Sequence, residues 1–358
     1  MKSDSVLILE DGHWFRGCSF AADVDSFGKI VFNTSLSGYQ EILSDPSSAG
    51  QILTMTYPMI GSYGVNSKDA QSDKVHSVGL VVKKYVDRPS HYRSEMSLAE
   101  YLKKFNVPAI EGIDSRRLVI TLRETGPMAA GIFIGKSYDN SLLKEVRSFA
   151  SDSRDLTEGV TTKQHYQFSK NSNKKYRIAV IDFGVKRSTL QELDKVNFEV
   201  HVFPANTLAG DIVDFDAIFL SDGPKNLTLN SDQTKLLLEL EKPIMAIGTA
   251  QQMIAYAKGG QIMKRNSAIQ GGSSVREMTT GQVKMVNSNS MYCANISDVN
   301  DIVINFEDAN SGSTQGFTNT ESPIILAVNF SPEGAPGAQD TRHLYRDFHR
   351  LVEAYVNK

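Results

Sequence analysis

The sequence predicts an α/β protein in two parts, an N-terminal mixed β/α domain followed by a doubly wound, mostly parallel α/β sheet. Short strand patterns crowd residues 1–135. From Arg177 onward, short apolar runs alternate with helical patterns, and that alternation favours a parallel sheet. A polar stretch rich in Ser, Asp, Lys and Asn separates the two patterns. We therefore predict a first domain over residues 1–140, a connector over 141–176 and a second domain over 177–358.

The composition is that of an ordinary soluble globular protein. The 358 residues are enough for two cores, and 41% are hydrophobic. A net charge of −3 with scattered Lys and Arg predicts no nucleic-acid partner, and no apolar run is long enough to cross a bilayer. The two cysteines, Cys18 and Cys293, argue against a disulfide framework and for the cytoplasm. No Cys/His cluster has metal-ligand spacing, so we expect no metal and no resident cofactor.

In the first part, turn residues bound the strand patterns. Asp11-Gly12 predicts a hairpin-like turn after the apolar run 6–9, and Asp114 is the predicted N-cap of a helix that carries Leu118 and Leu122. These patterns predict a mixed sheet with helices to one side. Further strands are expected at 29–33, 51–57, 78–82 and 131–135, and a further helix at 98–105.

In the second part, strands and helices alternate before a run of strands. Parallel strands are expected at 178–181, 199–203, 217–220 and 244–247, with helices at 188–196 and 231–240. A meander is expected over 282–286, 302–305, 314–318 and 324–329, followed by a last helix over 339–355.

Residues 242–260 carry the pattern of an active-site turn. They predict a buried strand, a sharp turn and an amphipathic helix, which is where many α/β enzymes hold a nucleophile. The residue at the turn is Gly248, which has no side chain that could attack a substrate.

Motifs along nearly the whole chain resemble one family. Residues 31–35 (VFNTS), 37–41 (SGYQE), 45–47 (DPS), 56–61 (TYPMIG) and 112–118 (GIDSRRL) are similar to the N-terminal domain of the small subunit of carbamoyl phosphate synthetase. The second half is similar to the class I glutamine amidotransferase domain that follows in that family. The resemblance implies a large synthetase subunit as partner, which would use ATP, and a role in carbamoyl phosphate synthesis for the pyrimidine and arginine pathways.

In that family the small subunit hydrolyses glutamine and delivers ammonia to the large subunit. The reaction needs a thiolate, which a helix N-terminus and a neighbouring histidine make reactive at neutral pH. The histidine protonates the departing ammonia, a carboxylate orients the histidine, and backbone N–H groups hold the oxyanion.

This chain departs from the family pattern at the catalytic positions. The elbow G-x-C-x-G-x-Q is AIGTAQQ here, which places Gly248 at the cysteine position. The H-P-E segment is Ser331-Pro332-Glu333, so Ser331 stands at the histidine position and only the carboxylate of Glu333 remains. Glu333 has two interpretations, a leftover orienting carboxylate or, as we favour, a polar residue of a Pro/Gly turn. None of the seven histidines lies at a motif position. Thr249 lacks a histidine partner in the motif.

The pocket positions are partly kept. Ser47 and Gln252 match the family. The oxyanion turn G-P-G is Gly223-Pro224-Lys225, where Lys225 has two interpretations, an anion contact or a solvated turn residue. The glutamine-holding segment Q-N-H-G-F is residues 288–292, which gives the pocket positions Asn289, Met291 and Tyr292. Cys293 next to it is interpreted as a small buried hydrophobe.

These departures predict an inactive glutaminase. The leading hypothesis is a structural or allosteric small subunit that supports a large subunit using free ammonia. The alternative is a free-standing binding or regulatory protein that takes glutamine or another small molecule. A third hypothesis keeps an active glutamine hydrolase with displaced catalytic residues.

Overall fold

The computed structural model describes residues 3–150, 154–169, 174–224, 231–319 and 322–358. The chain divides into two compact units, Met1–Asp155 with Asn266–Gln270, and Leu156–Arg265 with Gly271–Lys358. Both contain helices and strands, so the predicted α/β class is confirmed. Within the described ranges, no helix is both long and apolar enough to cross a membrane.

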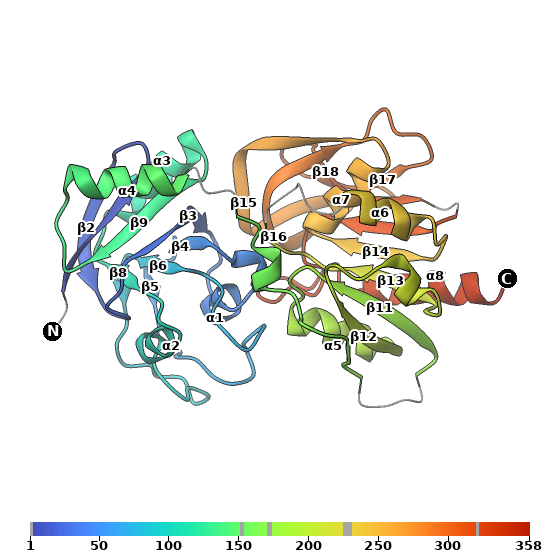
Figure 1. The fold of residues 1–358 in the computed structure, drawn as a ribbon, viewed down its shortest axis with the longest axis horizontal. Coiled ribbons are helices and arrows are strands. Elements are labelled where there is room, and N and C mark those ends of the chain that lie inside the picture. Colours follow the sequence, from blue (N-terminus) through green and yellow to red (C-terminus); the bar gives the residue numbers. More distant parts are fainter. Residues whose placement is uncertain (1–2, 151–153, 170–173, 225–230, 320–321) are drawn as a thin grey trace. The chain divides into compact units, whose positions relative to one another are not determined.

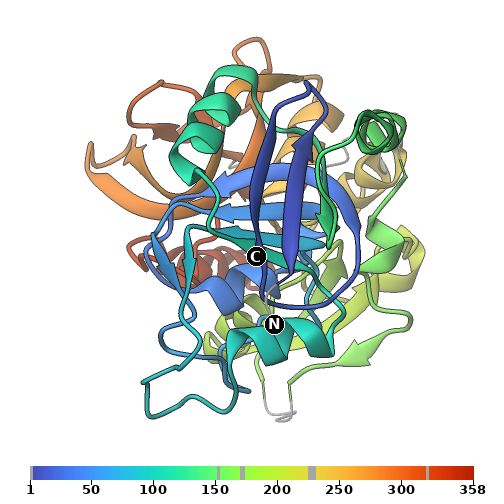
Figure 2. The same ribbon diagram turned by 90° about the vertical axis from the view of Figure 1, so that its left-hand side faces the viewer.

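The first unit contains a closed barrel of seven strands, which faces the viewer in Figure 2. The sequence predicted a mixed sheet but not its closure, which depends on the antiparallel pairs β1–β9 and β2–β8. Apolar side chains such as Leu7, Ile52 and Ile132 form one buried cluster of this barrel. In barrel order the strands are β1 (Asp4–Leu9), β2 (Trp14–Ser19), β8 (Ala109–Glu111), β6 (Gly79–Val82), β4 (Gln51–Met55), β3 (Ser26–Asn33) and β9 (Met128–Ile134).

The helices of the first unit pack into three different clusters rather than to one side as predicted. One cluster contains α1 and α2, a second contains α3, and a third contains α4. Asp114 caps α3 as expected, since its side chain accepts from the amide of Arg117 at 3.0 Å. The elements are α1 (Tyr39–Leu43), η1 (Pro46–Ser48), α2 (Leu98–Lys104), α3 (Ser115–Thr125) and α4 (Asn140–Ala150), with a small parallel pair β5 (Met59–Ile60) and β7 (Lys84–Tyr85).

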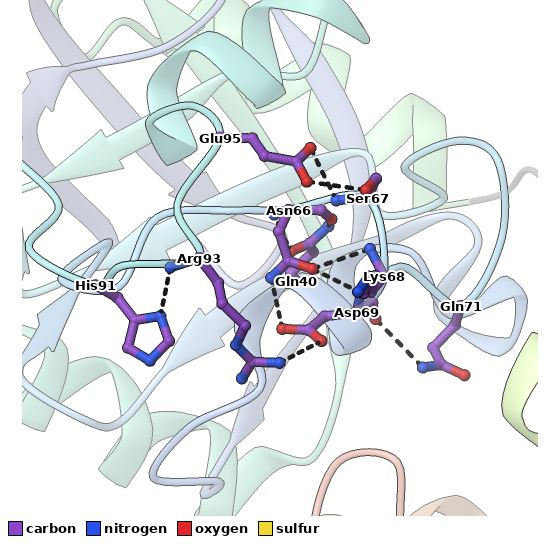
Figure 3. Close-up of polar contacts among 9 residues, drawn as sticks. All are labelled: Gln40, Asn66, Ser67, Lys68, Asp69, Gln71, His91, Arg93 and Glu95. Carbon is purple, nitrogen blue, oxygen red and sulfur yellow. Dashed lines mark hydrogen bonds and ion pairs between the residues drawn. The ribbon is translucent and has the colours of Figure 1, made fainter.

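A polar network holds α1 against the loops that follow β5 and β7 (Figure 3). The Gln40 amide donates to the carbonyl of Asn66 at 2.6 Å and accepts from the backbone N–H of Asn66 at 3.0 Å. The Asn66 side chain donates to Asp69 at 2.7 Å and accepts from the amides of Lys68 and Asp69. Arg93 lies 3.8 Å from the Asp69 carboxylate. Ser67 donates twice to Glu95. Motif residue Gln40 therefore serves as a backbone partner for a distant loop.

The second unit is built on a sheet of ten strands. The five strands β12, β11, β13, β14 and β19 are parallel, and antiparallel strands flank them on both sides. In sheet order they are β10 (Tyr166–Gln167), β12 (Phe198–Pro204), β11 (Tyr176–Asp182), β13 (Ala217–Leu220), β14 (Ile244–Ile247), β19 (Ile325–Val328), β18 (Thr314–Asn319), β17 (Val303–Asp308), β15 (Gln261–Glu277) and β16 (Val283–Asn295).

Helices cover both faces of this sheet, as a doubly wound fold requires (Figure 1). On β11, Ile178 and Val180 belong to the cluster that includes α5 (Arg187–Lys195) and α8 (Leu344–Val356). The alternate residues Ala179 and Ile181 belong to the cluster that includes α6 (Ser231–Leu238) and α7 (Thr249–Ala257). Two short 3₁₀ turns, η2 (Thr157–Gly159) and η3 (Ala209–Ile212), complete the unit.

Several predicted bounds differ from the structure, such as strand 51–57, which ends at Met55, and strand 131–135, which begins at Met128. The last helix begins at Leu344 and not at residue 339, and α6 ends at Leu238 and not at residue 240. The largest difference is the pair β15 and β16, of which only residues 282–286 had been predicted as strand. Strand β15 reads QIMKRNSAIQGGSSVRE, which has no sustained apolar run, so cross-strand partners decide its conformation.

Candidate functional site

The predicted elbow is present at the end of β14. The backbone of Gly248 has φ 57° and ψ −122°, and α7 begins at the next residue, Thr249. The amide of Gly248 donates to the carbonyl of Val328 on the neighbouring strand at 2.8 Å. The combination of a positive φ with this ψ strains any residue that carries a β-carbon, so Gly248 holds the turn without that strain.

The Asp222 side chain fills the space beside Gly248. A β-carbon placed on Gly248 would lie 2.1 Å from the carboxyl carbon of Asp222, and 2.3 and 2.5 Å from its two oxygens. Such distances are shorter than any non-bonded contact between these atoms. The Oδ1 atom of Asp222 also accepts from the amides of Gly223 and Thr249, each at 2.8 Å. No motif or spacing in the sequence indicates this contact.

Gly223 is fixed by close packing. A β-carbon on Gly223 would lie 2.4 Å from the carbonyl oxygen of Phe183. The hydroxyl of Thr249 donates to the carbonyl of Gly223 at 3.2 Å, which ties the start of α7 to this turn. Lys225, predicted at the third position of the same turn, lies outside the described residues.

Ser331 and Glu333 both contact the buried side chain of Lys186. The Nζ atom of Lys186 donates to the Ser331 hydroxyl at 2.9 Å and forms an ion pair with Glu333 Oε1 at 2.6 Å. The side chains of Lys186 and Glu333 are 4% and 1% exposed. Glu333 also accepts from the hydroxyls of Thr189 and Tyr345, at 3.1 and 2.8 Å. A cation therefore contacts both positions that the family pattern assigns to the base and its orienting carboxylate.

The charge of Glu333 is stabilised despite its burial. Burial raises the pKa of this carboxyl, but the Lys186 ammonium and the hydrogen bonds from Lys186 and Tyr345 outweigh burial, so its pKa lies below the usual value. Burial, followed by the Glu333 charge, raises the pKa of the Tyr345 hydroxyl, which therefore stays a donor. The sequence did not indicate Lys186, Thr189 or Tyr345, because they come from α5 and α8.

The glutamine-holding positions lie on β16 and are bonded to their neighbours. The carbonyl of Tyr292 accepts from the side chains of Gln252 at 3.2 Å, Asn329 at 3.2 Å and Ser290 at 2.6 Å. Gln252 also donates to Asn329 at 3.2 Å. Met291 is buried, and Asn289 lies on the same strand. Gln252 thus links α7 to β16 through protein partners.

The predicted site residues therefore fall into three local groups in the second unit. Gly248 and Gly223 share Asp222, Ser331 and Glu333 share Lys186, and Gln252 and Tyr292 share Asn329. An isolated bridge links the second and third groups, since the Ser331 amide donates to the carbonyl of Asn287 on β16 at 2.9 Å. Ser47 belongs to the first unit, where it lies buried in η1 and its amide donates to Asp45.

Cys293 and the histidines at the edge of the sheet have partners of their own. Cys293 is buried, with its sulfur 3.8 Å from the carbonyl of Met263. His201 contacts Glu199 at 2.7 Å and His165 at 3.1 Å, at the β10 and β12 edge of the sheet. In the described parts of the chain, no cluster of three or more His, Cys, Asp or Glu side chains could hold a metal.

Two models of known protein families match the two parts of the chain. Residues 179–351 match the model of class I glutamine amidotransferases, and residues 7–132 match the model of the carbamoyl-phosphate synthase small chain, CPSase domain. Similar full-length relatives are the carbamoyl phosphate synthase small chains of Nitratidesulfovibrio vulgaris (34% identical, 97% of this chain and 98% of that protein) and Caldanaerobacter subterraneus subsp. tengcongensis (36%, 98% and 97%). That of Photorhabdus laumondii subsp. laumondii is 36% identical over 100% of this chain and 98% of its own length. The chain belongs to the carbamoyl phosphate synthase small chain family.

Proposed function

We propose that this chain is a small subunit that binds a large synthetase subunit and does not hydrolyse glutamine. The observation that carries the proposal is the elbow, where Gly248 offers no nucleophile and Asp222 fills the adjoining space. At the base position, Ser331 accepts a hydrogen bond from Lys186, and no imidazole stands there. Loss of the nucleophile or the base alone lowers the rate of a comparable triad by about 10⁶-fold. Two such losses leave no useful turnover.

The proposed role is structural or allosteric. The large subunit would bind ATP and form carbamoyl phosphate from free ammonia in the cytoplasm, for pyrimidine and arginine synthesis, while this chain holds no cofactor. The first unit supplies the proposed contact, because its motif segments keep the family pattern while the second unit loses its catalytic residues. Glutamine or another small molecule is at most a weak ligand of the altered pocket.

Co-expression with a family large subunit tests this proposal. We expect a complex that co-purifies by size-exclusion chromatography and makes carbamoyl phosphate with ammonium but not with glutamine. A chain that remains separate from the large subunit would contradict the proposal and favour the free-standing binding protein. Covalent labelling of the unmodified chain by an electrophilic glutamine analogue would instead favour a hydrolase with displaced residues.

Restoring the nucleophile alone is a second test. We expect Gly248→Cys to give no glutamine turnover, because the base position still carries Ser331 and the Asp222 carboxylate overlaps the new side chain. We also expect unchanged or lower stability, since cysteine is less tolerant of a φ of 57°. Ammonia release from glutamine by the purified variant in the complex is the measurement, and clear turnover would contradict the expectation.

A further inference from the structure

The turn after β13 brings a carboxylate to two converging backbone donors. The Oδ1 atom of Asp222 accepts at 2.8 Å from the amide of Gly223 and at 2.8 Å from the amide of Thr249. Thr249 is the first residue of the nine-residue helix α7, so its N–H lies at the positive end of a helix dipole. Two backbone donors that meet on one anionic oxygen are the arrangement that acyl-transfer enzymes use for an oxyanion. Here the anion is part of the chain.

The same carboxylate takes the volume of any side chain at position 248. All three atoms of the Asp222 carboxylate would lie within 2.5 Å of a β-carbon on Gly248. The Asp222 side chain therefore accepts from the two backbone donors that could hold an oxyanion. It also fills the space that a nucleophilic side chain at position 248 would need. Glycine is favoured at position 248 for two separate reasons, the positive φ of its backbone and the contact that any β-carbon would make with Asp222.

Hydrogen bonds hold the backbone on both sides of this contact, so the Asp222 side chain is the part that has to move. Ser221 accepts from the amide of Phe183 at 2.9 Å and donates to the carbonyl of Asp222 at 2.9 Å, which fixes the backbone of the turn. Ser221 is fully buried. On the opposite side, the amide of Gly248 is held by the carbonyl of Val328 at 2.8 Å. A larger residue at 248 must therefore displace the Asp222 side chain from its two donors.

We propose that Asp222 is an internal plug that closes the elbow, so the site is blocked as well as lacking its nucleophile. The inference rests on the proposed function in that it takes the elbow as the site that has lost catalysis. It adds that Gly248 and Asp222 depend on each other, and that a cysteine returned to position 248 stays shielded until Asp222 is shortened.

The test is the alkylation rate of a cysteine at position 248. Gly248→Cys, Gly248→Cys with Asp222→Ala, and Gly248→Cys with Asp222→Asn are each treated with iodoacetamide, and peptide mass spectrometry follows residue 248. Cys18, which is half-buried, serves as the internal reference. We expect the Asp222→Ala double variant to react at least about tenfold faster than the single variant, a change of about 1.4 kcal/mol in barrier. The Asp222→Asn variant keeps the side-chain volume and should stay slow. Equal rates in the single and Asp222→Ala variants would overturn the proposal.

A second measurement tests the proposal even if the cysteine variants do not fold. Gly248→Ala is introduced with and without Asp222→Ala, and the urea midpoints of the four chains form a double-mutant cycle. We expect Gly248→Ala to lower the midpoint markedly in the wild-type background and distinctly less in the Asp222→Ala background. Additive shifts would overturn the proposal. Failure of the proposed function would be visible independently, as glutamine turnover by the unmodified chain.

Discussion

The motif residues of the two units differ in the kind of partner that they contact. In the first unit, motif side chains are bonded to the backbone of neighbouring loops: Gln40 exchanges two hydrogen bonds with Asn66, and the Tyr39 hydroxyl donates to the carbonyl of Gly64 at 2.6 Å. In the second unit, charged side chains contact the predicted site residues, with Asp222 beside Gly248 and Lys186 beside Ser331 and Glu333.

The difference indicates two reasons for keeping a residue. In the first unit, removing a buried hydrogen-bond partner such as Gln40 costs free energy whatever the function. In the second unit, the amides of Gly223 and Thr249 donate to the Asp222 carboxylate, and the Glu333 carboxylate is paired with the Lys186 ammonium.

The largest effect is expected from Lys186→Met. The change leaves the Glu333 carboxylate buried without its cation, which should lower the free energy of unfolding by about 3–5 kcal/mol. Urea unfolding measures the loss. The double variant with Glu333→Gln should recover part of the stability, because no buried charge is then left unpaired.

The matched control is Lys175→Met, which breaks the exposed pair between Lys175 and Glu353. This variant should leave the urea midpoint unchanged, since water replaces the partner. Similar losses in the buried and exposed variants would show that the Lys186 pair has no special role in the second unit.

A smaller effect, with a pH dependence, is expected from Glu41→Gln in the first unit. Burial raises the pKa of Glu41 to about 7, with a further contribution from the Asp69 charge, while its own amide and Arg93 act in the opposite direction. In the unfolded chain the pKa of Glu41 lies near its ordinary value of 4.5, so the native state binds more protons between these two values and stability falls as pH rises through them.

Glu41→Gln should remove that fall and make the chain more stable than wild type at pH 8 by about 2 kcal/mol. Urea unfolding at pH 5 and pH 8 measures the effect, with the exposed Glu124→Gln as control. Buried His76 acts in the opposite direction, because burial lowers its pKa to about 4 and stability is lost as pH falls from 6.5. Identical pH profiles for Glu41→Gln and wild type would show that Glu41 is not the source.

The smallest of these effects is expected from Asn66→Ala, which removes three hydrogen bonds of the network in Figure 3. Since the site is half-buried and water can replace part of them, we expect a loss of about 1–2 kcal/mol. Thermal unfolding compares the variant with Asn300→Ala, an exposed asparagine of the second unit. If both changes have the same effect, the network contributes nothing specific to the first unit.

The fold class, most strands and helices, the turn at Gly248 and the family could be predicted from the amino-acid sequence. These features follow from local apolar spacing, from turn residues and from motifs that are contiguous in the chain. The same spacing could not show strand β15, whose polar sequence becomes a strand only through its partners in the sheet.

The side chains that contact the predicted site residues come from distant parts of the sequence and could not be predicted from it. Asp222 and Thr249 are hydrogen-bonded although 27 residues separate them in the sequence, and Lys186 and Ser331 are hydrogen-bonded although 145 residues separate them. An isolated Asp after a strand or a Lys before a helix has no pattern that predicts such a partner. Barrel closure in the first unit has the same origin, because it pairs β1 with β9 from opposite ends of that unit. Local spacing determines which elements form, whereas long-range packing decides which side chains share a site, since that depends on where the folded backbone brings them.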